Sequence, residues 1–481
     1  MKLLDTSAGP SVRPARVLLV NFIAAWLVAF MSTAINIALP SIQVEFHLNA
    51  VLLGWLPLAY VLASAVFLLT FGKVGDRYGR RRLFLTGLVL FACCSIAMVF
   101  AGSYLPLVLL RIGQGLGGAM IFSTSVAMIT QAYPPGRRGF AMGMSVAAAY
   151  LGQTTGPVIG GVIVHNIGWR DLFLVTGCFA LGALGLDLWL LRGADWKAER
   201  PGRFDWPGSV AWGISLSLFL IGLSWLPLTK GVVLFVAGLA GIGFFIWWEL
   251  RARSPLIVLR LFRGNRVFAF SNLASLISYL SIWGTTFLMS LYLQFVKGLN
   301  PQTAGIVMIA GVALQCLVSP FGGRLSDRFD PRWLASFGMG IYTVGALLLS
   351  FVGAKTSFGY IILGLCLLGF GYAFFAGPNQ SCIMGCVEPR YLGFASALIG
   401  TVRMVGNALS IAVVTLIMAL VVGRHDIQPA DYPRLLTATR LSFAIFTGLS
   451  AVAVVASLVR GKMPAHADPA AEAPGIAVGE P

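Results

Sequence analysis

Charged residues are scarce in this sequence. Only 11% of its 481 residues are charged and 58% are hydrophobic, whereas soluble domains contain about 25% charged residues. This composition excludes a water-soluble enzyme built from two or three domains. A membrane-spanning helix needs about 20 apolar residues, so the chain is long enough for roughly a dozen spans or more. The sequence therefore predicts an all-α polytopic membrane protein in a lipid bilayer.

Acidic residues are also few: the chain has 17 of them against 34 basic residues, a net charge of +17. Such an excess is typical of nucleic-acid binding. Here, however, the basic residues lie in short loops between apolar runs, where membrane proteins keep them on the cytoplasmic side. With the N-terminus inside, 25 of them fall in inner segments and 7 in outer loops. We expect a multi-pass cell membrane protein with both termini cytoplasmic and no nucleic-acid partner.

Histidine and cysteine offer no reactive cluster. The four histidines lie in expected loops or the tail, and the seven cysteines lie in or beside apolar runs. Neither arrangement has the spacing of a metal site or of a catalytic group. Since no cysteine falls in a loop expected outside the membrane, we expect no disulfides. The sequence predicts no metal, no cofactor and no enzymatic activity.

Apolar runs predict fourteen membrane spans, grouped as six, two and six. They lie at about 17–39, 52–71, 83–100, 106–129, 140–164, 172–191, 208–226, 232–248, 267–293, 305–321, 334–352, 359–375, 395–422 and 441–459. The expected organisation is a cytoplasmic N-terminus (1–16), a six-helix bundle (17–192), linkers with two extra spans (193–265), a second six-helix bundle (266–460) and a disordered cytoplasmic tail (461–481).

An internal repeat supports this division. Residues 72–81 read GKVGDRYGRR and residues 323–332 read GRLSDRFDPR, and each follows the second span of its half. Paired repeats are a recurring plan of secondary transporters, in which the substrate path runs between the halves.

Five stretches carry a resemblance to a known family. They are NIALPSI (36–42), GKVGDRYGRRR (72–82), RIGQGLGGA (111–119), GMSVAAAYLGQTTGPVIGG (143–161) and PLIVLRLF (255–262). In these motifs the chain resembles the major facilitator superfamily and, within it, the fourteen-span drug/proton antiporter branch. The resemblance covers about residues 17–459. It implies a major facilitator fold of two six-helix bundles plus two extra helices.

The loop at 72–82 contains one acid among five basic residues. Its glycines predict a tight turn, and Asp76 could pair with the basic residues or with a helix N-terminus. An ordinary basic inner loop is the alternative reading. The resemblance implies that the acid latches the two halves in one state. The residues of this motif and its repeat are Gly72, Asp76, Arg77, Gly79, Arg80, Asp327 and Arg328.

Arg111 lies a few residues into the fourth span. A charge within a bilayer costs several kcal/mol, so it should face the bundle interior and have a partner; snorkelling to the outer interface is the alternative. The resemblance implies a part in proton coupling, with Gln114 one turn away. Arg403 in the thirteenth span allows the same interpretation.

Small residues recur every fourth position in the fifth span. This spacing predicts a bare stripe along which helices pack closely, while Pro157 should bend the helix. Packing without a further function is the alternative. The resemblance associates the stripe with exporters, in which it seals the path against leak. The motif residues are Gly143, Gly152, Gly156, Pro157, Gly160 and Gly161.

One departure from the family concerns the first span. Fourteen-span antiporters typically carry an aspartate where this chain has Met31. We find no other carboxylate at mid-membrane. Asp187, near the inner end of span six, is a coupling candidate that could titrate when partly buried, or could simply pair with Arg192. The sequence therefore favours weak or substrate-borne proton coupling.

These features favour a secondary active transporter that exports small amphipathic molecules or drugs by proton antiport. An uncoupled or differently coupled metabolite facilitator or importer of the same fold is the alternative. We expect a monomer whose partners are a small-molecule substrate, lipid and, if coupled, protons. From their span positions, the residues expected at the substrate cavity are Trp26, Met31, Asn36, Gln153, Trp283 and Gln315.

Overall fold

A computed structural model describes residues 13–134, 137–193, 205–252, 255–326, 329–388 and 391–461. Asp327 and Arg328 of the repeat, most of the expected N-terminal segment and nearly all of the expected tail lie outside these ranges. The described chain is helical, with one isolated β-bridge between Asn49 and Asp426.

The first half of the chain forms six long helices. They are α1 (Pro14–Phe46), α2 (Ala50–Tyr78), α3 (Arg80–Val99), α4 (Tyr104–Ala132), α5 (Arg138–Asn166) and α6 (Trp169–Leu190). Two further helices follow: α7 (Trp206–Trp225) and α8 (Thr229–Glu249). The second half contains α9 (Arg260–Gly264), α10 (Arg266–Leu291), a π-helix (Tyr292–Val296), α11 (Pro301–Ser326), α12 (Pro331–Leu349), α13 (Phe358–Gly385), α14 (Leu392–Val421), a short 3-10 helix (Pro429–Asp431) and α15 (Tyr432–Val459).

Thirteen of the described helices are long and apolar enough to cross a membrane, which confirms the all-α polytopic class. The fourteenth expected span, α5, has 29 residues but is not among the thirteen. Its glycines, threonines and Gln153 lower its hydropathy. Length and hydropathy alone therefore do not confirm the predicted count of fourteen.

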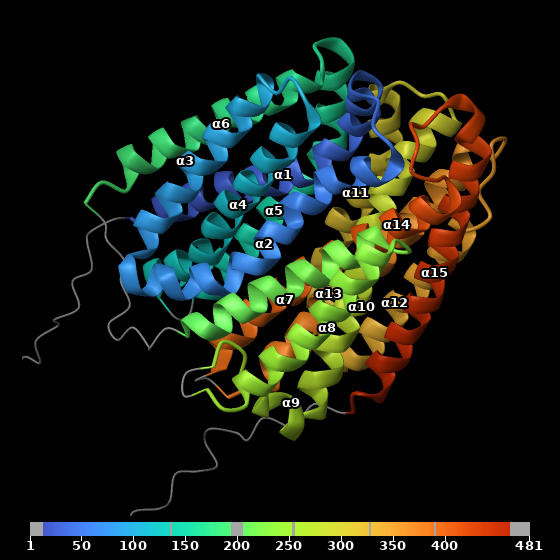
Figure 1. Ribbon diagram of the computed structural model, residues 1–481. Helices are drawn as coiled ribbons and strands as arrows, with labels where there is room; N and C mark the ends of the chain where they lie inside the picture. Colours follow the sequence, from blue (N-terminus) through green and yellow to red (C-terminus); the bar gives the residue numbers. More distant parts are fainter. Residues whose placement is uncertain are drawn as a thin grey trace, which may run out of the picture.

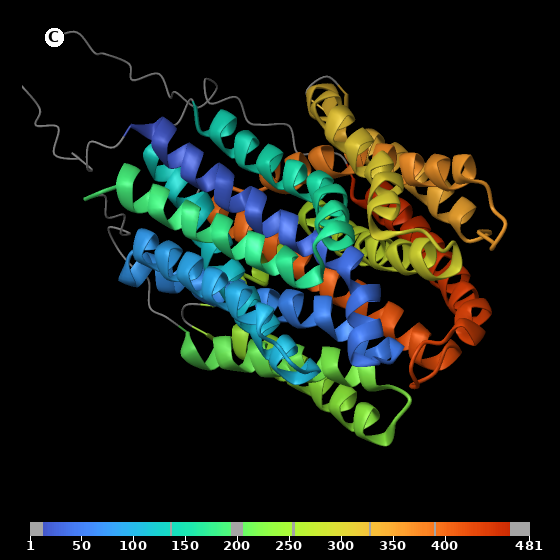
Figure 2. The ribbon, with the colours of Figure 1, turned by 90° about the horizontal axis from the view of Figure 1, so that it is seen from above.

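The helices gather into two groups that meet along two seams (Figures 1 and 2). The first group contains α1–α6 and the second contains α10–α15. At one seam α2 packs against α14, and at the other α5 packs against α11. The α7–α8 pair lies against α2 and α14, on the outside of the first seam (Figure 1).

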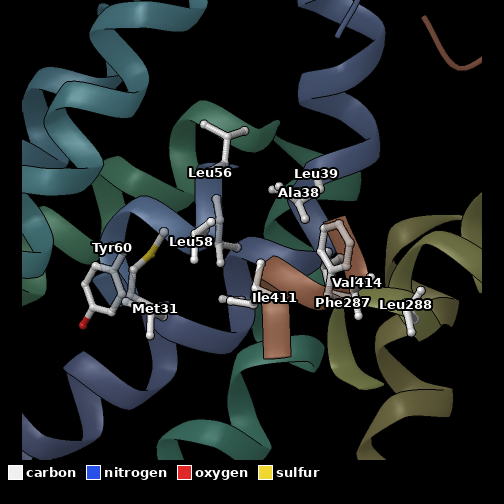
Figure 3. Close-up of a cluster of buried hydrophobic side chains, with 14 of the residues drawn as sticks. Met31, Ala38, Leu39, Leu56, Leu58, Tyr60, Phe287, Leu288, Ile411 and Val414 are labelled. Atoms are coloured by element: carbon white, nitrogen blue, oxygen red, sulfur yellow. The ribbon is translucent and has the colours of Figure 1, made fainter. Parts of the chain in front are cut away.

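Successive long helices run in opposite directions, so α1 begins and α15 ends at the same end of the bundle. We call this the proximal end and the opposite end the distal end. A single hydrophobic core crosses from one helix group to the other, because α1 and α2 meet α10 and α14 there. Figure 3 shows this junction through the side chains Met31, Ala38, Leu39, Leu56, Leu58, Tyr60, Phe287, Leu288, Ile411 and Val414.

The helices extend beyond the predicted spans, which corrects one local expectation. Gly72 and Gly75 were expected in a tight turn but belong to the last turns of α2. Of the three glycines in this motif, Gly79 alone has a positive φ, 110°, which favours glycine at a turn. Gly75 instead permits close packing, because a Cβ there would lie 3.0 Å from the Thr124 methyl carbon of α4.

Candidate functional site

A cavity lies between the two helix groups, with most of its wall supplied by the second group. Its volume is about 90 Å³, below the roughly 300–1,000 Å³ of a typical small-molecule site. No charged residue lines it. The lining residues are Thr33 of α1, Gln153 and Pro157 of α5, Ile282, Trp283, Thr285, Thr286 and Met289 of α10, Met308, Gly311, Val312 and Gln315 of α11, Tyr342 of α12, and Leu365, Leu368, Gly369 and Tyr372 of α13.

Three of the six residues expected at the cavity line it: Gln153, Trp283 and Gln315. Trp26 instead faces α5 and donates to the Thr155 hydroxyl at 3.2 Å. Met31 is fully buried, and its sulfur accepts a hydrogen bond from Thr176 of α6 at 3.4 Å. Span position fixes the depth of these residues but not the helix face they occupy.

Several lining residues escaped sequence reasoning, including Tyr342 and Tyr372. One signal could have found part of the wall. Met308 and Gly311 lie seven and four residues before Gln315, so all three share a face of α11. The tyrosines carried no such signal, because their helices reach the cavity only through tertiary packing.

Asn36 belongs to a contact layer on the distal side of the cavity. Its carbonyl, one turn beyond Thr33, accepts a hydrogen bond of 2.5 Å from Ser290. Gln294, in the π-helix that continues α10, donates to the Ile37 carbonyl at 3.2 Å. This layer joins the two helix groups immediately beyond the cavity.

Two further contacts join the groups at the distal surface. Gln43 donates to the carbonyl of Ile427 at 3.4 Å, and Asn49 donates to the carbonyl of Arg424 at 3.4 Å. Together with the bridge between Asn49 and Asp426, these bonds close the distal end above the cavity.

The predicted stripe on α5 packs against both helix groups. Side chains at Gly152 and Gly156 would collide with the α1 backbone, and a Cβ at Gly160 would lie 3.0 Å from that of Ala34. Gly161 faces the other group, where its Cβ would lie 2.6 Å from the carbonyl oxygen of Pro301.

The remaining members of the motif differ in their surroundings. The carbonyl of Pro157 touches Gly305 of α11 at the seam, so this residue contributes both to the packing and to the cavity wall. Gly143 has open space around it. The motif is therefore one packing surface from 152 to 161, with Gly143 outside it.

Arg111 is buried within the first helix group, with 1% of its surface exposed. Its Nε donates to the Leu56 carbonyl at 3.1 Å, and Nη1 donates to the Gln114 side chain at 2.5 Å. The Tyr60 ring lies under the guanidinium at 4.6 Å. Arg111 therefore has internal partners, does not snorkel and does not line the cavity.

Asp187 is fully buried at the proximal end of α6. It forms an ion pair of 2.9 Å with Arg81 of α3, and the Arg81 guanidinium also donates to the Asp187 carbonyl at 3.2 Å. Pairing with Arg192, one of the two alternatives that the sequence left open, is not what the structure shows. Since helix ends distant in sequence meet here, sequence proximity favoured the incorrect partner.

The proximal motif contains a second ion pair, between Asp76 and Arg80, at 2.7 Å. The two residues are four apart in the chain, and the Asp76 side chain is 41% exposed. Arg77 is exposed and contacts the neighbouring Tyr78 ring. The structure records these contacts within the first helix group.

Arg403 lies on α14 at the seam between the groups. Its guanidinium stacks on the ring of Phe122 from α4, with 4.5 Å between the guanidinium carbon and the ring centre. Its Nε is buried and has no hydrogen-bond partner among the described residues. Unlike Arg111, this arginine spans both groups.

The histidines, cysteines and acids of the described ranges do not gather in groups of three or more that could hold a metal. The seven cysteines are free thiols. The electrostatic features described above are the uncharged cavity, the buried Arg111 within the first helix group and the partly buried Arg403 at the seam.

Comparison with known proteins gives this architecture a family. Residues 22–270 and 271–478 each match the Major Facilitator Superfamily, so the match covers both helix groups. The chain belongs to the Major Facilitator Superfamily. It is thus a transporter-family protein, as its membrane helices and internal repeat indicated.

Several curated superfamily members are similar over most of their length. Multidrug resistance protein Stp of Mycobacterium tuberculosis is 32% identical, covering 84% of this chain and 76% of Stp. The tetracenomycin C resistance and export protein of Streptomyces glaucescens is 32% identical, in a match that covers 89% of this chain and 81% of that protein. Riboflavin transporter RibZ of Clostridioides difficile is 28% identical, in a match that covers 82% of this chain and 86% of RibZ.

A solved structure shares the superfamily fold. The crystal structure of a bacterial homologue of the human lysosomal transporter Spinster, inward-facing and unoccupied, superposes with a TM-score of 0.64. The match covers 94% of this chain and 98% of that chain, at 19% identity. At this identity the similarity concerns the fold alone.

Proposed function

We propose that this transporter exports small amphipathic molecules across the cell membrane by alternating access. The observation that carries the proposal is the uncharged cavity between the two helix groups, closed on its distal side. Aromatic rings, methionines and a few hydroxyl and amide groups suit an apolar ligand with polar attachment points. The multidrug resistance and export relatives support the direction of transport.

The cavity volume supports movement as part of this function. At about 90 Å³ it is smaller than drug-sized ligands need, so binding requires the helix groups to separate. The seams permit such separation because glycines bring the helices close with few interlocking side chains, as at Gly161 and Gly305.

We assign the protein to the fourteen-span drug/proton antiporter branch, with α5 as the fourteenth span. Its 29 residues correspond to about 44 Å of helix, more than a bilayer core requires. Both termini are proposed to be cytoplasmic, in keeping with the distribution of basic residues. The functional unit is proposed to be a monomer with its substrate, lipid and protons as partners.

Proton coupling is proposed to be weak or carried by the substrate. Met31 replaces the usual acid and is buried against Thr176, and no carboxylate lines the cavity. Arg111 cannot carry a proton because arginine stays protonated. Asp187 is the coupling candidate, because breaking its buried ion pair with Arg81 would remove the charge that stabilises its ionised carboxylate and would favour protonation.

Uncoupled or differently coupled transport of a metabolite is the second candidate function. The missing acid in α1 favours it, and the similarity to riboflavin transporter RibZ is consistent with it. The cavity itself suits either function, because its walls carry no charge that selects a drug over a neutral metabolite.

Dye transport in proteoliposomes tests these proposals. A non-ionising fluorescent dye should move in parent vesicles, with at most a weak response to an imposed pH gradient. Met31→Asp should strengthen that response because it restores an acid to α1. Strong proton-driven export by the parent that survives Asp187→Asn would contradict the coupling proposal, and no dye movement under any condition would contradict the export proposal.

A further inference from the structure

A polar face of α14 lies outside the cavity described above, whose lining includes no residue of that helix. Arg403 and Asn407 lie four residues apart, so they share a face of the helix. Asn407 is 1% exposed. Both polar atoms of its amide, and Nε of Arg403, are buried without a hydrogen-bond partner among the described residues. Buried polar groups in proteins are nearly always paired, because an unpaired group has lost its hydrogen bonds to water without replacing them.

The groups around Arg403 do not neutralise it. Its guanidinium contacts the Phe122 ring at 4.5 Å. It interacts electrostatically with Tyr150 and Tyr372, whose hydroxyls also contact Ser319 and Tyr279, respectively. Over the described ranges, no ion pair joins Arg403 to a carboxylate. Arg403 is partly buried, and a cation with a buried, unpaired Nε beside neutral hydroxyl groups has the composition of an anion site.

This face adjoins the cavity on its proximal side. Tyr372 belongs to both, because it lines the cavity and interacts with Arg403. Tyr279 meets the Tyr372 ring edge to face at 6.2 Å and lies three residues before the lining residue Ile282. Tyr150 lies three residues before Gln153 on α5. These three tyrosines therefore lie at the proximal side of the cavity, between its other lining residues and Arg403.

Small residues hold α14 close to both helix groups at this level. A Cβ at Gly400 would lie 3.4 Å from the Phe122 ring of α4. A Cβ at Gly406 would lie 2.6 Å from that of Tyr279 on α10. Arg403, between these glycines, is thus placed at the meeting of the two groups, where a ligand passing between them must come near it.

We propose that Arg403 and Asn407, with the hydroxyls of Tyr150 and Tyr372, form a subsite for an anionic group of the transported molecule. The group is a carboxylate, sulfonate or phosphate attached to an apolar body that occupies the uncharged cavity. Arginine suits this role because its planar fork of N–H donors matches such oxyanions and its charge is permanent. The inference rests on the proposed function, since it assumes a ligand held in that cavity.

Two dyes that differ in one group test the subsite directly. Dansylsulfonate carries an anionic sulfonate, and dansylamide carries a neutral sulfonamide on the same ring system. Binding of each dye to the full chain in nanodiscs is followed by energy transfer from tryptophan, with empty nanodiscs as background. No gradient or transport is involved, so a failure of export does not affect the result.

The parent should bind the sulfonate more tightly than the sulfonamide. Arg403→Gln should reduce this preference about ten-fold, because it removes a charged hydrogen-bond donor, and Arg403→Lys should retain part of it. Asn407→Leu should reduce the preference by a smaller factor. Arg434→Gln is the matched control: it removes the same charge from a side chain that is 62% exposed at the distal end, and it should leave the preference unchanged.

Either of two results would overturn the proposal. A parent protein without preference for the sulfonate has no anionic subsite. An equal change in the binding of both dyes in Arg403→Gln would show that Arg403 supports the fold of the cavity instead. Thermal unfolding of each variant identifies a misfolded protein, and Arg403→Lys then decides the outcome because it keeps the charge.

Discussion

At the scale of single residues, two arginines within the helix bundle, Arg111 and Arg403, differ in their partners. Arg111 is satisfied by the Leu56 carbonyl, Gln114 and the Tyr60 ring, all from its own helix group. Arg403 has a ring from the opposite group and an unpaired Nε. The first arrangement stabilises one group internally. The second leaves a charge available where the groups meet, which is why we propose a ligand-binding role for Arg403 alone.

Asp76→Asn should slow transport while the protein still inserts and folds. The Asp76 side chain is 41% exposed and accepts hydrogen bonds from Nε and Nη2 of Arg80, so the loss of this surface pair should cost about 1 kcal/mol. The expected effect is on switching between states, because the family resemblance makes this acid a latch. Dye efflux and thermal unfolding should be measured together, with Arg434→Gln as a control that breaks an exposed ion pair outside the motif. A variant that transports at the parent rate would exclude the latch role.

At the scale of helices, α5 determines how the two groups approach each other. One part of its glycine surface meets α1, and Gly161 meets the start of α11. A bare surface lets backbones approach closely and makes the contact sensitive to any added atom. The small-residue stripe on α5 is therefore a packing surface between the two helix groups, and Gln153 and Pro157 within it link it to the cavity wall.

Gly156→Val should destabilise the protein by about 1–3 kcal/mol, the usual cost of overpacking. A Cβ at Gly156 would lie 2.9 Å from the carbonyl oxygen of Phe30 and would collide with Thr33. Thermal unfolding in detergent measures the change. Gly143→Ala provides the matched control, because nothing lies within 4 Å of its Cβ position and alanine is the better helix former. Equal unfolding temperatures for the two variants would contradict this packing role.

At the scale of the whole molecule, the two groups are held together at the distal end. The contacts there come from α1, the π-helix after α10 and the segment before α15. All three lie beyond the cavity, so the groups must part there if the cavity is to open on the distal side. Alternating access thus requires these hydrogen bonds to break and form again in each cycle.

A disulfide across the distal end should stop transport. Asn49 and Asp426 form an antiparallel bridge, in which Cα atoms lie about 4.5–5.5 Å apart, a separation that a disulfide can span. Asn49→Cys with Asp426→Cys, in a background without the native cysteines, should lose dye efflux on oxidation and regain it on reduction. Each single variant serves as a control. Full efflux by the oxidised double variant would mean that the distal end need not open.

The membrane orientation can be tested with single cysteines in the same background. Gln428→Cys lies at the exposed distal surface, and Lys197→Cys lies in the linker before α7, outside the described residues. If both termini are cytoplasmic, an impermeant thiol reagent added outside cells should label position 428 and leave 197 unlabelled. Labelling of 197 alone would invert the orientation.

The sequence by itself determined the class of the protein and the approximate positions of its helices, and it placed the small-residue stripe on one helix. These properties follow from local composition: apolar runs of sufficient length must span the bilayer, and glycines four residues apart must share a face. That is why Gly152, Gly156 and Gly160 could be placed on one surface, whereas Gln153, Trp283 and Gln315 were expected at the cavity from their depth alone.

Only the tertiary structure decided which partners those residues meet. Asp187 pairs with Arg81, more than a hundred residues earlier, and not with the neighbouring Arg192. Asn36 became a distal contact and Met31 a buried packing residue. The physical reason is that rotation of a helix about its axis is set by packing against its neighbours, which come from anywhere in the chain. The depth of a residue in the membrane therefore follows from the local sequence, whereas the direction in which its side chain points depends on the packing of the whole helix bundle.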